Sequence, residues 1–366
     1  MEGFNSTRDT QVMLRPSACA VRQRLHPRLM SIRLNWGIIA TGGIARAFAS
    51  GVAHSKLGHL AAVGSRSMES AEKFAHEFGV DRAHGSYEAL LADPQVQAVY
   101  VATPHPQHAE WIMKAARAGK HVLCEKPLSL TYAEAAAAAE VCRAQNVLLM
   151  EAFMYRCHPQ TAKVVELVRS GALGRIGLVQ AAFGFANTFD AKNRFWSKEL
   201  GGGAILDVGC YPVSFARLIA GADGGSAFAN PVSVTGAVQL HPDAGVDTSA
   251  TASLHFASGM LAQVSTSIAL QQDNSVRIYG TDGWLHLPEP WVPAREGGDV
   301  EFFHYLGGDP APETIIVPSP EWLYGLEADA FAEAVEAGVR DVPQMSVDDS
   351  LGNMAALDAW RACATG

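Results

Sequence analysis

The sequence lacks the features of several protein classes. Its six cysteines are scattered over 366 residues without a C-x-x-C pair, so neither a disulfide framework nor a cysteine zinc site is indicated. No apolar run reaches the roughly 18 residues of a membrane-spanning helix. The formal net charge of -9 is opposite in sign to the basic footprint of nucleic-acid-binding proteins. These absences predict a cytoplasmic protein with reduced thiols and with neither a nucleic-acid nor a membrane partner.

The first residues differ from the rest in composition. Residues 1–29 contain five arginines but only two acidic residues, and no apolar segment long enough for a secretory signal. We expect residues 1–33 to be a disordered extension, or the product of a start codon placed upstream of the true one at Met30. A targeting peptide is the alternative.

A glycine turn follows the first predicted strand, residues 35–40, and precedes a helical pattern that runs to about His54. In dinucleotide-binding folds such a turn lets the backbone approach a pyrophosphate at the positive end of the helix. Ala40 stands where the G-x-G-x-x-G fingerprint has its first glycine, so the motif is imperfect. The turn predicts cofactor contacts by Thr41, Gly42, Gly43 and Ile44.

The second predicted strand, residues 60–64, ends in Ser65 and Arg66. Enzymes that use NAD usually place an acid there, against the ribose 2′-hydroxyl. No acid is present at this strand end. A hydroxyl and a guanidinium suit a 2′-phosphate instead, because arginine can donate two parallel hydrogen bonds to it. The sequence therefore predicts NADP as the cofactor.

A strand at residues 98–102 leads into T-P-H-P-Q-H. Two histidines three residues apart can bind a metal, but no third ligand accompanies them. A turn beside the nicotinamide ribose is favoured, and no metal site is predicted. The turn adds Thr103, Pro104, His105 and His108 to the expected cofactor contacts.

The segment Lys120–Pro127 reads K-H-V-L-C-E-K-P, a buried strand that stops at a proline. In open parallel sheets, ligands bind outside the carboxyl ends of the strands. Glu125 and Lys126 lie at such an end, so both are predicted to contact the cofactor.

Strands and helices alternate up to residue 153, which predicts an α/β Rossmann nucleotide-binding domain over residues 34–153. Recurrent β-branched runs between residues 232 and 317, followed by helices at 321–337 and 346–362, predict an α+β domain over residues 154–366. Its sheet is expected to be large, open and mainly antiparallel. Within it, Asp207 and Tyr211 are four residues apart and would share a helix face.

The motifs A-T-G-G-I-A, G-S-R-S, T-P-H-P-Q-H, A-G-K-H-V-L-C-E-K-P and E-A-F-M-Y-R-C-H-P occur in this order. In this respect the chain resembles the Gfo/Idh/MocA oxidoreductase family, most closely the branch of dimeric dihydrodiol dehydrogenase and NADP-dependent D-xylose dehydrogenase. The resemblance implies a sugar or cyclic diol as substrate, and a homodimer formed through one face of the large sheet. It also implies that Asp207 and Tyr211 face the substrate beside Lys126.

These residues suggest an NADP-dependent dehydrogenase that transfers hydride between the nicotinamide and a carbinol carbon. The carbinol loses a proton as it loses hydride, so a general base is needed. We expect Tyr211 to be that base, with its pKa lowered by the Lys126 ammonium. Asp207 would orient the substrate, and His158 is a further candidate for substrate contact.

Two other functions remain open from the sequence. The chain could be a sugar–sugar oxidoreductase that retains tightly bound NADP(H), or a non-catalytic NADP-binding regulator on the same scaffold. Which sugar or diol is used, and in which direction, also stays open.

Overall fold

The structure is a computed structural model, and it describes residues 33–365. The extension predicted for residues 1–33, with its alternative start at Met30, lies outside the described residues except for Arg33. Among the described residues, five cysteines are free thiols.

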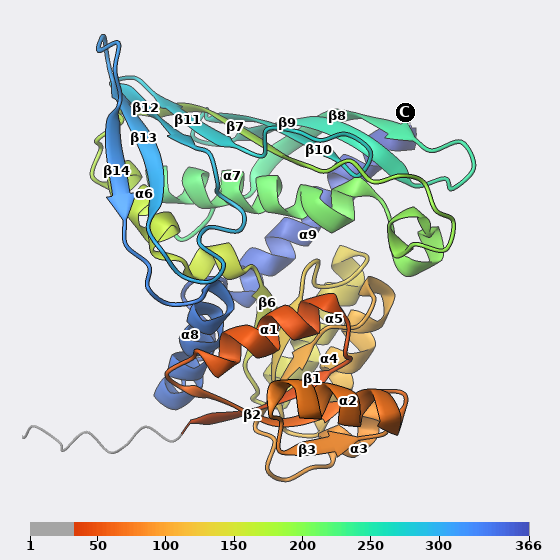
Figure 1. Cartoon of the computed structure of the whole chain (residues 1–366). Helices are drawn as coiled ribbons and strands as arrows, with labels where there is room; N and C mark the ends of the chain where they lie inside the picture. The colour runs from red at the N-terminus through yellow and green to blue at the C-terminus, as the bar shows by residue number, and fades with distance from the viewer. Residues whose placement is uncertain (1–32, 366) are drawn as a thin grey trace, which may run out of the picture. The chain divides into compact units, whose positions relative to one another are not determined.

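The amino-terminal half contains a sheet of six parallel strands in the order β3-β2-β1-β4-β5-β6 (Figure 1). The strands are β1 (Leu34–Ile39), β2 (Gly58–Gly64), β3 (Arg82–His84), β4 (Ala98–Val101), β5 (His121–Glu125) and β6 (Leu149–Ala152). The strand order reverses between β1 and β4, which is where doubly wound sheets bind dinucleotides.

Helices connect these strands, and their packing explains why the central strands are almost wholly buried. The helices are α1 (Gly43–Ala53), α2 (Met68–Phe78), α3 (Tyr87–Leu91), α4 (His108–Arg117) and α5 (Tyr132–Ala144). The predicted Rossmann fold is confirmed. The short edge strand β3 was not predicted, because Arg82-Ala83-His84 has no apolar signature. The boundary between residues 153 and 154 stays a prediction.

The second sheet has eight strands in the order β14-β13-β12-β11-β7-β10-β9-β8. They are β7 (Ile176–Gly184), β8 (Pro231–Leu240), β9 (Asp247–Phe256), β10 (Leu261–Ser267), β11 (Val276–Gly280), β12 (Gly283–Leu287), β13 (Val300–Leu306) and β14 (Glu313–Val317). Every pairing is antiparallel except that of β7 with β10. The predicted large, mainly antiparallel sheet is therefore confirmed.

Side chains alternate across this sheet. In β9, Ala250, Ala252 and Leu254 are buried on the side that faces the helices, whereas Thr251 and Ser253 point away.

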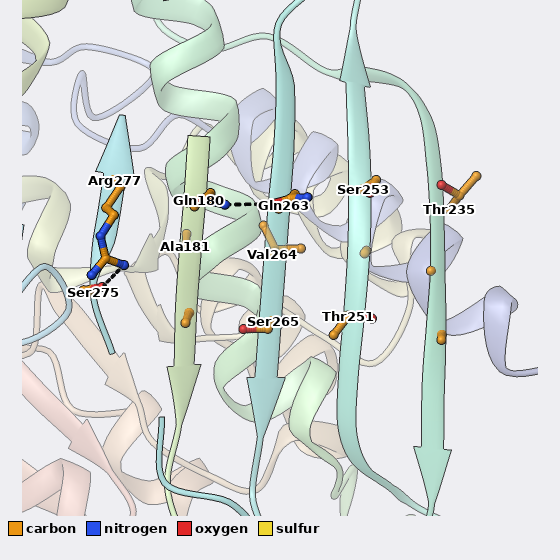
Figure 2. Close-up of a pocket in the computed structure, with 14 residues that line it drawn as sticks. Gln180, Ala181, Thr235, Thr251, Ser253, Gln263, Val264, Ser265, Ser275 and Arg277 are labelled. Carbon is orange, nitrogen blue, oxygen red and sulfur yellow. Dashed lines mark hydrogen bonds between the residues drawn. The ribbon is translucent and has the colours of Figure 1, made fainter. Parts of the chain in front are cut away.

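Helices pack against one face of this sheet. The helices of this half are α6 (Pro159–Arg169), α7 (Cys210–Asp223), α8 (Leu323–Ala337) and α9 (Val347–Ala362). The opposite face is a shallow groove of small and polar side chains across β11, β7, β10, β9 and β8 (Figure 2).

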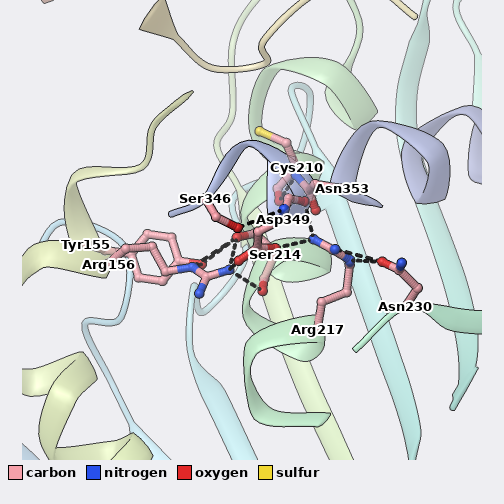
Figure 3. Close-up of polar contacts among 9 residues, drawn as sticks. All are labelled: Tyr155, Arg156, Cys210, Ser214, Arg217, Asn230, Ser346, Asp349 and Asn353. Carbon is pink, nitrogen blue, oxygen red and sulfur yellow. Dashed lines mark hydrogen bonds and ion pairs between the residues drawn. The ribbon is translucent and has the colours of Figure 1, made fainter. Parts of the chain in front are cut away.

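A buried ionic cluster joins the start of the second half to its helices (Figure 3). The Asp349 carboxylate on α9 lies 2.9 Å from the Arg156 guanidinium and 2.6 Å from that of Arg217 on α7. Ser214 and Asn230 accept further hydrogen bonds from the two arginines. One carboxylate thus stands between two buried guanidinium groups and ties three segments together.

One helical stretch of the described residues, Lys198–Asp223, has the length and mean hydropathy (1.3) of a membrane span, but its apolar window is completely buried inside the protein. It contains α7, which is a core helix of the second half.

Candidate active site

A pocket of about 750 Å³ opens at the carboxyl ends of β1, β2, β4 and β5. Every residue predicted to contact the cofactor lines it: Thr41, Gly42, Gly43, Ile44, Ser65, Arg66, Thr103, Pro104, His105, His108, Glu125 and Lys126. Tyr211 reaches the same pocket from the second half of the chain. The structure thus brings segments that are distant in sequence to one site.

The glycine turn is open to a ligand. Gly42 is the N-cap of α1 and provides no side-chain cap, and the first turn contains no acidic residue. A Cβ atom added at Gly42 or Gly43 would meet no atom within 4 Å. Ala40 adopts a φ of 87°, a conformation that favours glycine. The unpartnered N–H groups of this helix start fit an anionic pyrophosphate.

The end of β2 presents Ser65, which is buried, and Arg66, which is exposed. Arg66 forms no ion pair within residues 33–365. Glu125 is the only acidic side chain that lines the pocket in the described part of the chain. The surroundings of Arg66 therefore favour an anionic ligand.

The two histidines hold the walls of the pocket in place. The ring nitrogens of His108 lie 2.8 Å from the carbonyl oxygens of Pro127 and Thr103, and His105 Nδ1 lies 3.2 Å from the Gly201 carbonyl. Burial lowers the pKa of His105 to about 3 and that of His108 to about 4, although the two carbonyls favour a charged His108. Within the described residues, no group of three or more His, Cys, Asp or Glu side chains could hold a metal ion.

Lys126, Asp207 and Tyr211 lie together. Lys126 follows β5, Asp207 belongs to a π-helical turn (Ile205–Gly209), and Tyr211 is in the first turn of α7. The Lys126 ammonium donates to the main-chain carbonyl of Asp207 at 2.7 Å and lies 5.0 Å from the centroid of the Tyr211 ring. Single π-helical turns frequently occur at functional sites.

The Asp207 side chain is buried next to the pocket but does not line it. It is 3% exposed and forms an ion pair with the Arg194 guanidinium at 2.9 Å. Burial alone would raise the pKa of Asp207, but the charges of Lys126 and Arg194 outweigh it and lower the pKa. Asp207 is thus a charged carboxylate, while Val208 and Tyr211 line the pocket.

The environment of Tyr211 corrects one expectation from the sequence. Its hydroxyl donates to Met154 Sδ at 3.6 Å, and its ring packs edge-on against Phe153 and Phe183. Burial raises the pKa of Tyr211 well above its ordinary value, and the nearby Glu125 raises it further. The expected lowering by Lys126 is wrong for this structure, because aromatic packing removes the water that would stabilise a phenolate.

His158 does not line this pocket. It is fully buried, and its Nδ1 accepts a hydrogen bond from the Gln160 N–H at 3.0 Å, which caps α6. Burial lowers its pKa to about 4. The position of His158 is that of a helix cap, and its contact with the substrate stays a prediction.

Several pocket residues were not singled out from the sequence. They come from segments far apart in the chain, and they are Tyr87, Gln107, Met154, Phe183, Arg194, Val208, Val292, Arg295 and Tyr324. A carboxylate network behind the pocket was also missed. The Tyr100 hydroxyl donates to Glu125, and the fully buried Glu327 has no hydrogen-bond partner for either oxygen among residues 33–365. Arg194 could have been suspected as a cation just before the glycine-rich segment; the others carry no local signal.

Comparison with known proteins agrees with this geometry. The family model "Oxidoreductase family, NAD-binding Rossmann fold" matches residues 34–153, and the "GFO/IDH/MocA C-terminal domain" model matches residues 161–286. The chain is 37% identical over 324 residues to D-xylose 1-dehydrogenase (NADP(+)) 2 of Haloferax volcanii, covering 88% of this chain and 95% of that protein. It is 33% identical over 326 residues to trans-1,2-dihydrobenzene-1,2-diol dehydrogenase of Mus musculus, covering 87% and 92%.

A solved structure has the same architecture. The aldose-aldose oxidoreductase from Caulobacter crescentus, complexed with glycerol, superimposes with a TM-score of 0.81 at 28% identity and covers 91% of this chain and 98% of that one. The two matching family models and these full-length relatives show that the chain belongs to the Gfo/Idh/MocA oxidoreductase family.

Proposed function

We propose that this protein is an NADP-dependent dehydrogenase that transfers hydride between the nicotinamide and a carbinol carbon of a sugar or a cyclic diol. The observation that carries the proposal is a single pocket lined by the glycine turn, by Arg66 and by the pair Lys126 and Tyr211. The relatives named above act on a pentose or on a cyclic diol, which supports this substrate class.

Different residues of the pocket bind different parts of the cofactor. The glycine turn binds the pyrophosphate, Ser65 and Arg66 bind the 2′-phosphate, and the segment from Thr103 to His108 packs beside the nicotinamide ribose. When bound, the nicotinamide supplies the hydride chemistry. The protein supplies position and charge.

At the substrate oxygen we assign two hydrogen-bond donors. Lys126 stabilises negative charge on that oxygen, and Tyr211 exchanges the proton with it. Because burial keeps the Tyr211 phenol protonated, Tyr211 is a ready proton donor for carbonyl reduction. In the oxidation direction, only the small phenolate fraction accepts the proton. Asp207 holds Lys126 through its main-chain carbonyl and Arg194 through its carboxylate. Its contact with a substrate hydroxyl stays a prediction.

A substrate panel tests the proposed function. Purified protein is incubated with aldopentoses, aldohexoses, inositols and trans-dihydrodiols, and formation of NADPH is followed by its absorbance. We expect turnover with at least one aldose or cyclic diol, and faster turnover with NADP⁺ than with NAD⁺. Absence of turnover over the whole panel in both directions would overturn the proposal.

The cofactor assignment predicts a selective effect of Arg66→Ala. The substitution removes charge-assisted hydrogen bonds to the 2′-phosphate, of about 1.5–3 kcal/mol. NADP⁺ affinity should therefore fall by about ten- to a hundredfold, while NAD⁺ affinity changes little. Fluorescence titration of both cofactors checks this. Equal losses for the two cofactors would contradict a 2′-phosphate contact.

A second function is favoured by one observation, the full-length similarity to an aldose-aldose oxidoreductase. In that case NADP(H) would stay bound while hydride passes between two sugars. Protein that retains NADP(H) after exhaustive dialysis, and that oxidises one aldose only when a second is present, would favour this function over cofactor release at each turnover.

We also propose that the protein forms a homodimer through the open face of the second sheet. The groove on this face is lined by small and polar side chains, and Arg277 is its only charged residue among those described (Figure 2). A large surface with so little charge is typical of an interface that buries its centre. Gln180 Nε2 donates to Gln263 Oε1 at 2.7 Å, which lowers the number of amide groups that an interface here would have to satisfy.

Light scattering should give a mass of twice 38.9 kDa. Ser253→Glu, which places a charge on the outward side of β9, should shift the protein towards monomer because the charge would be buried without a partner. A wild-type mass of one chain at micromolar concentration would contradict the dimer.

A further inference from the structure

The loop Trp291–Gly298 is pinned at both ends, and it places one arginine at the pocket. At its start, the Trp291 indole donates to the Ala182 carbonyl at 2.8 Å. At its end, Gly298 and Ser319 exchange two main-chain hydrogen bonds of 2.7 and 3.2 Å, and the Arg295 carbonyl accepts from the Leu323 N–H at 3.1 Å. The position of Arg295 is therefore set by the scaffold.

The backbone just before Arg295 is unusual. Ala294 adopts a φ of 41°, in the left-handed region that residues with a Cβ avoid. Such conformations persist only where the surroundings enforce them, and they gather at ligand sites. The pinned loop and the left-handed residue together direct Arg295 to the pocket lining.

The same loop is connected to helix α1, whose first turn is the glycine turn. Leu323 begins α8, and the Trp322 ring before it stacks on His54 at the end of α1, with ring centroids 3.8 Å apart. The adjacent Tyr324 lies directly against Gly51 of α1, where an added Cβ would come within 2.3 Å of the tyrosine Cβ. The loop thus packs, through the start of α8, on the carboxyl-terminal end of α1. The glycine turn lies at the other end of this helix, and Arg295 and the turn line the same pocket.

Four cationic side chains line the pocket: Arg66, Lys126, Arg194 and Arg295. Lys126 is bonded to the Asp207 carbonyl, and Arg194 is paired with the Asp207 carboxylate. Arg66 lies at the end of β2, where the 2′-phosphate is expected. Arg295 is exposed and, within residues 33–365, has no carboxylate within ion-pair distance; its guanidinium carbon lies 6.0 Å from the centroid of the Tyr324 ring. Like Arg66, it has no anionic partner among the described residues, but no phosphate has yet been assigned to it.

We propose that Arg295 binds the pyrophosphate of the dinucleotide, together with the glycine turn. This inference rests on the proposed NADP-dependent function. The N–H groups of the turn supply hydrogen bonds but no full charge, whereas a guanidinium supplies a full charge and two parallel donors to phosphate oxygens. Arg295 comes from the carboxyl-terminal half, so the bound dinucleotide is held by residues of both halves.

Equilibrium titration without substrate tests the proposal, using NADP⁺, NAD⁺ and adenosine 2′-monophosphate. The monophosphate carries the 2′-phosphate but neither phosphate of the pyrophosphate. Arg295→Ala should weaken NADP⁺ and NAD⁺ by the same factor, about tenfold or more, and leave the affinity for the monophosphate almost unchanged. Arg66→Ala should show the reverse pattern, with losses for NADP⁺ and the monophosphate but not for NAD⁺.

Two further variants serve as controls. Glu296→Gln changes the adjacent exposed residue of the same loop and should leave all three affinities unchanged. Arg295→Lys keeps the charge without the paired donors, and it should recover part of the lost affinity. Thermal unfolding of Arg295→Ala should match the wild type, because the side chain is exposed.

Unchanged dinucleotide affinity in Arg295→Ala would overturn the proposal, as would an equal loss for adenosine 2′-monophosphate. A rise in the substrate KM alone would also overturn it, since Arg295 would then contact the substrate, and the proposed function would still stand. A wild-type protein that bound neither dinucleotide would instead overturn the proposed function and this inference together.

Discussion

Tyr211→Phe should lower the turnover number for carbonyl reduction by about 10²–10⁴-fold, the usual contribution of a positioned acid–base group. Within the described part of the chain, the only hydrogen bond of the Tyr211 hydroxyl is to Met154 Sδ, so its removal leaves the aromatic packing around the ring intact. NADP(H) affinity should therefore change little. Steady-state kinetics in both directions, combined with cofactor titration, separates the two effects.

Lys126→Met should lower the turnover number by at least the same factor, because it removes the charge that is proposed to stabilise the substrate oxygen. The double variant should be little worse than the worse single variant, since residues that act as one unit are strongly non-additive. Losses that multiply in the double variant would show that the two residues act independently. Near-normal turnover in Tyr211→Phe would remove the tyrosine from the mechanism.

The direction of the Tyr211 pKa shift determines the pH dependence. Burial raises this pKa, so the phenol stays protonated up to and beyond its ordinary value near 10. Carbonyl reduction, which needs the protonated form, should be independent of Tyr211 ionisation across neutral pH. Oxidation needs the phenolate and should rise with pH without reaching a plateau below about pH 10. This rise should disappear in Tyr211→Phe.

Asp349→Ala should destabilise the protein by about 3–5 kcal/mol, because it leaves Arg156 and Arg217 buried without a counter-charge. Their side chains are 2% and 0% exposed, and that of Asp349 is 3% exposed. Urea unfolding, followed by the midpoint and slope, measures the loss.

The neighbouring residue provides a matched control. Asp348 on the same helix pairs with Arg143 at 2.6 Å, but their side chains are 72% and 50% exposed. Surface pairs of this kind contribute roughly 0–1 kcal/mol, so Asp348→Ala should have a small effect. Similar losses for both variants would show that the contribution of the Asp349 ion pairs to the free energy of unfolding does not depend on their burial.

The Rossmann half could be predicted almost strand by strand from the sequence. Its buried strands are short apolar runs, and turns such as Thr41–Ile44 carry glycine or proline signals that are local in the chain. The pocket positions of Ser65, Arg66 and Lys126, for which cofactor contacts are proposed, could be predicted because these residues follow such strands. Local pattern and tertiary position agree in parallel sheets, since all carboxyl ends meet at one edge.

Less of the second half could be predicted from the sequence. The parallel pairing of β7 with β10 joins residues that are more than 80 positions apart, and no local pattern encodes it. The same holds for Arg295 and Tyr324, which reach the pocket only through tertiary packing. The pKa of Tyr211 was predicted in the wrong direction because the sequence places a lysine nearby but does not show the aromatic side chains that exclude water.

The hydrogen bond from Lys126 to residue 207 has a consequence for how this site can evolve. Its acceptor is a main-chain carbonyl, which every amino acid possesses. Substitution of Asp207 can therefore change the side chain that pairs with Arg194 without removing the acceptor that holds the lysine. During evolution, residue 207 could therefore have been substituted while the Lys126 ammonium stayed in place. Residue 207 thus combines a side chain that can change with a main-chain carbonyl that keeps the Lys126 ammonium in position.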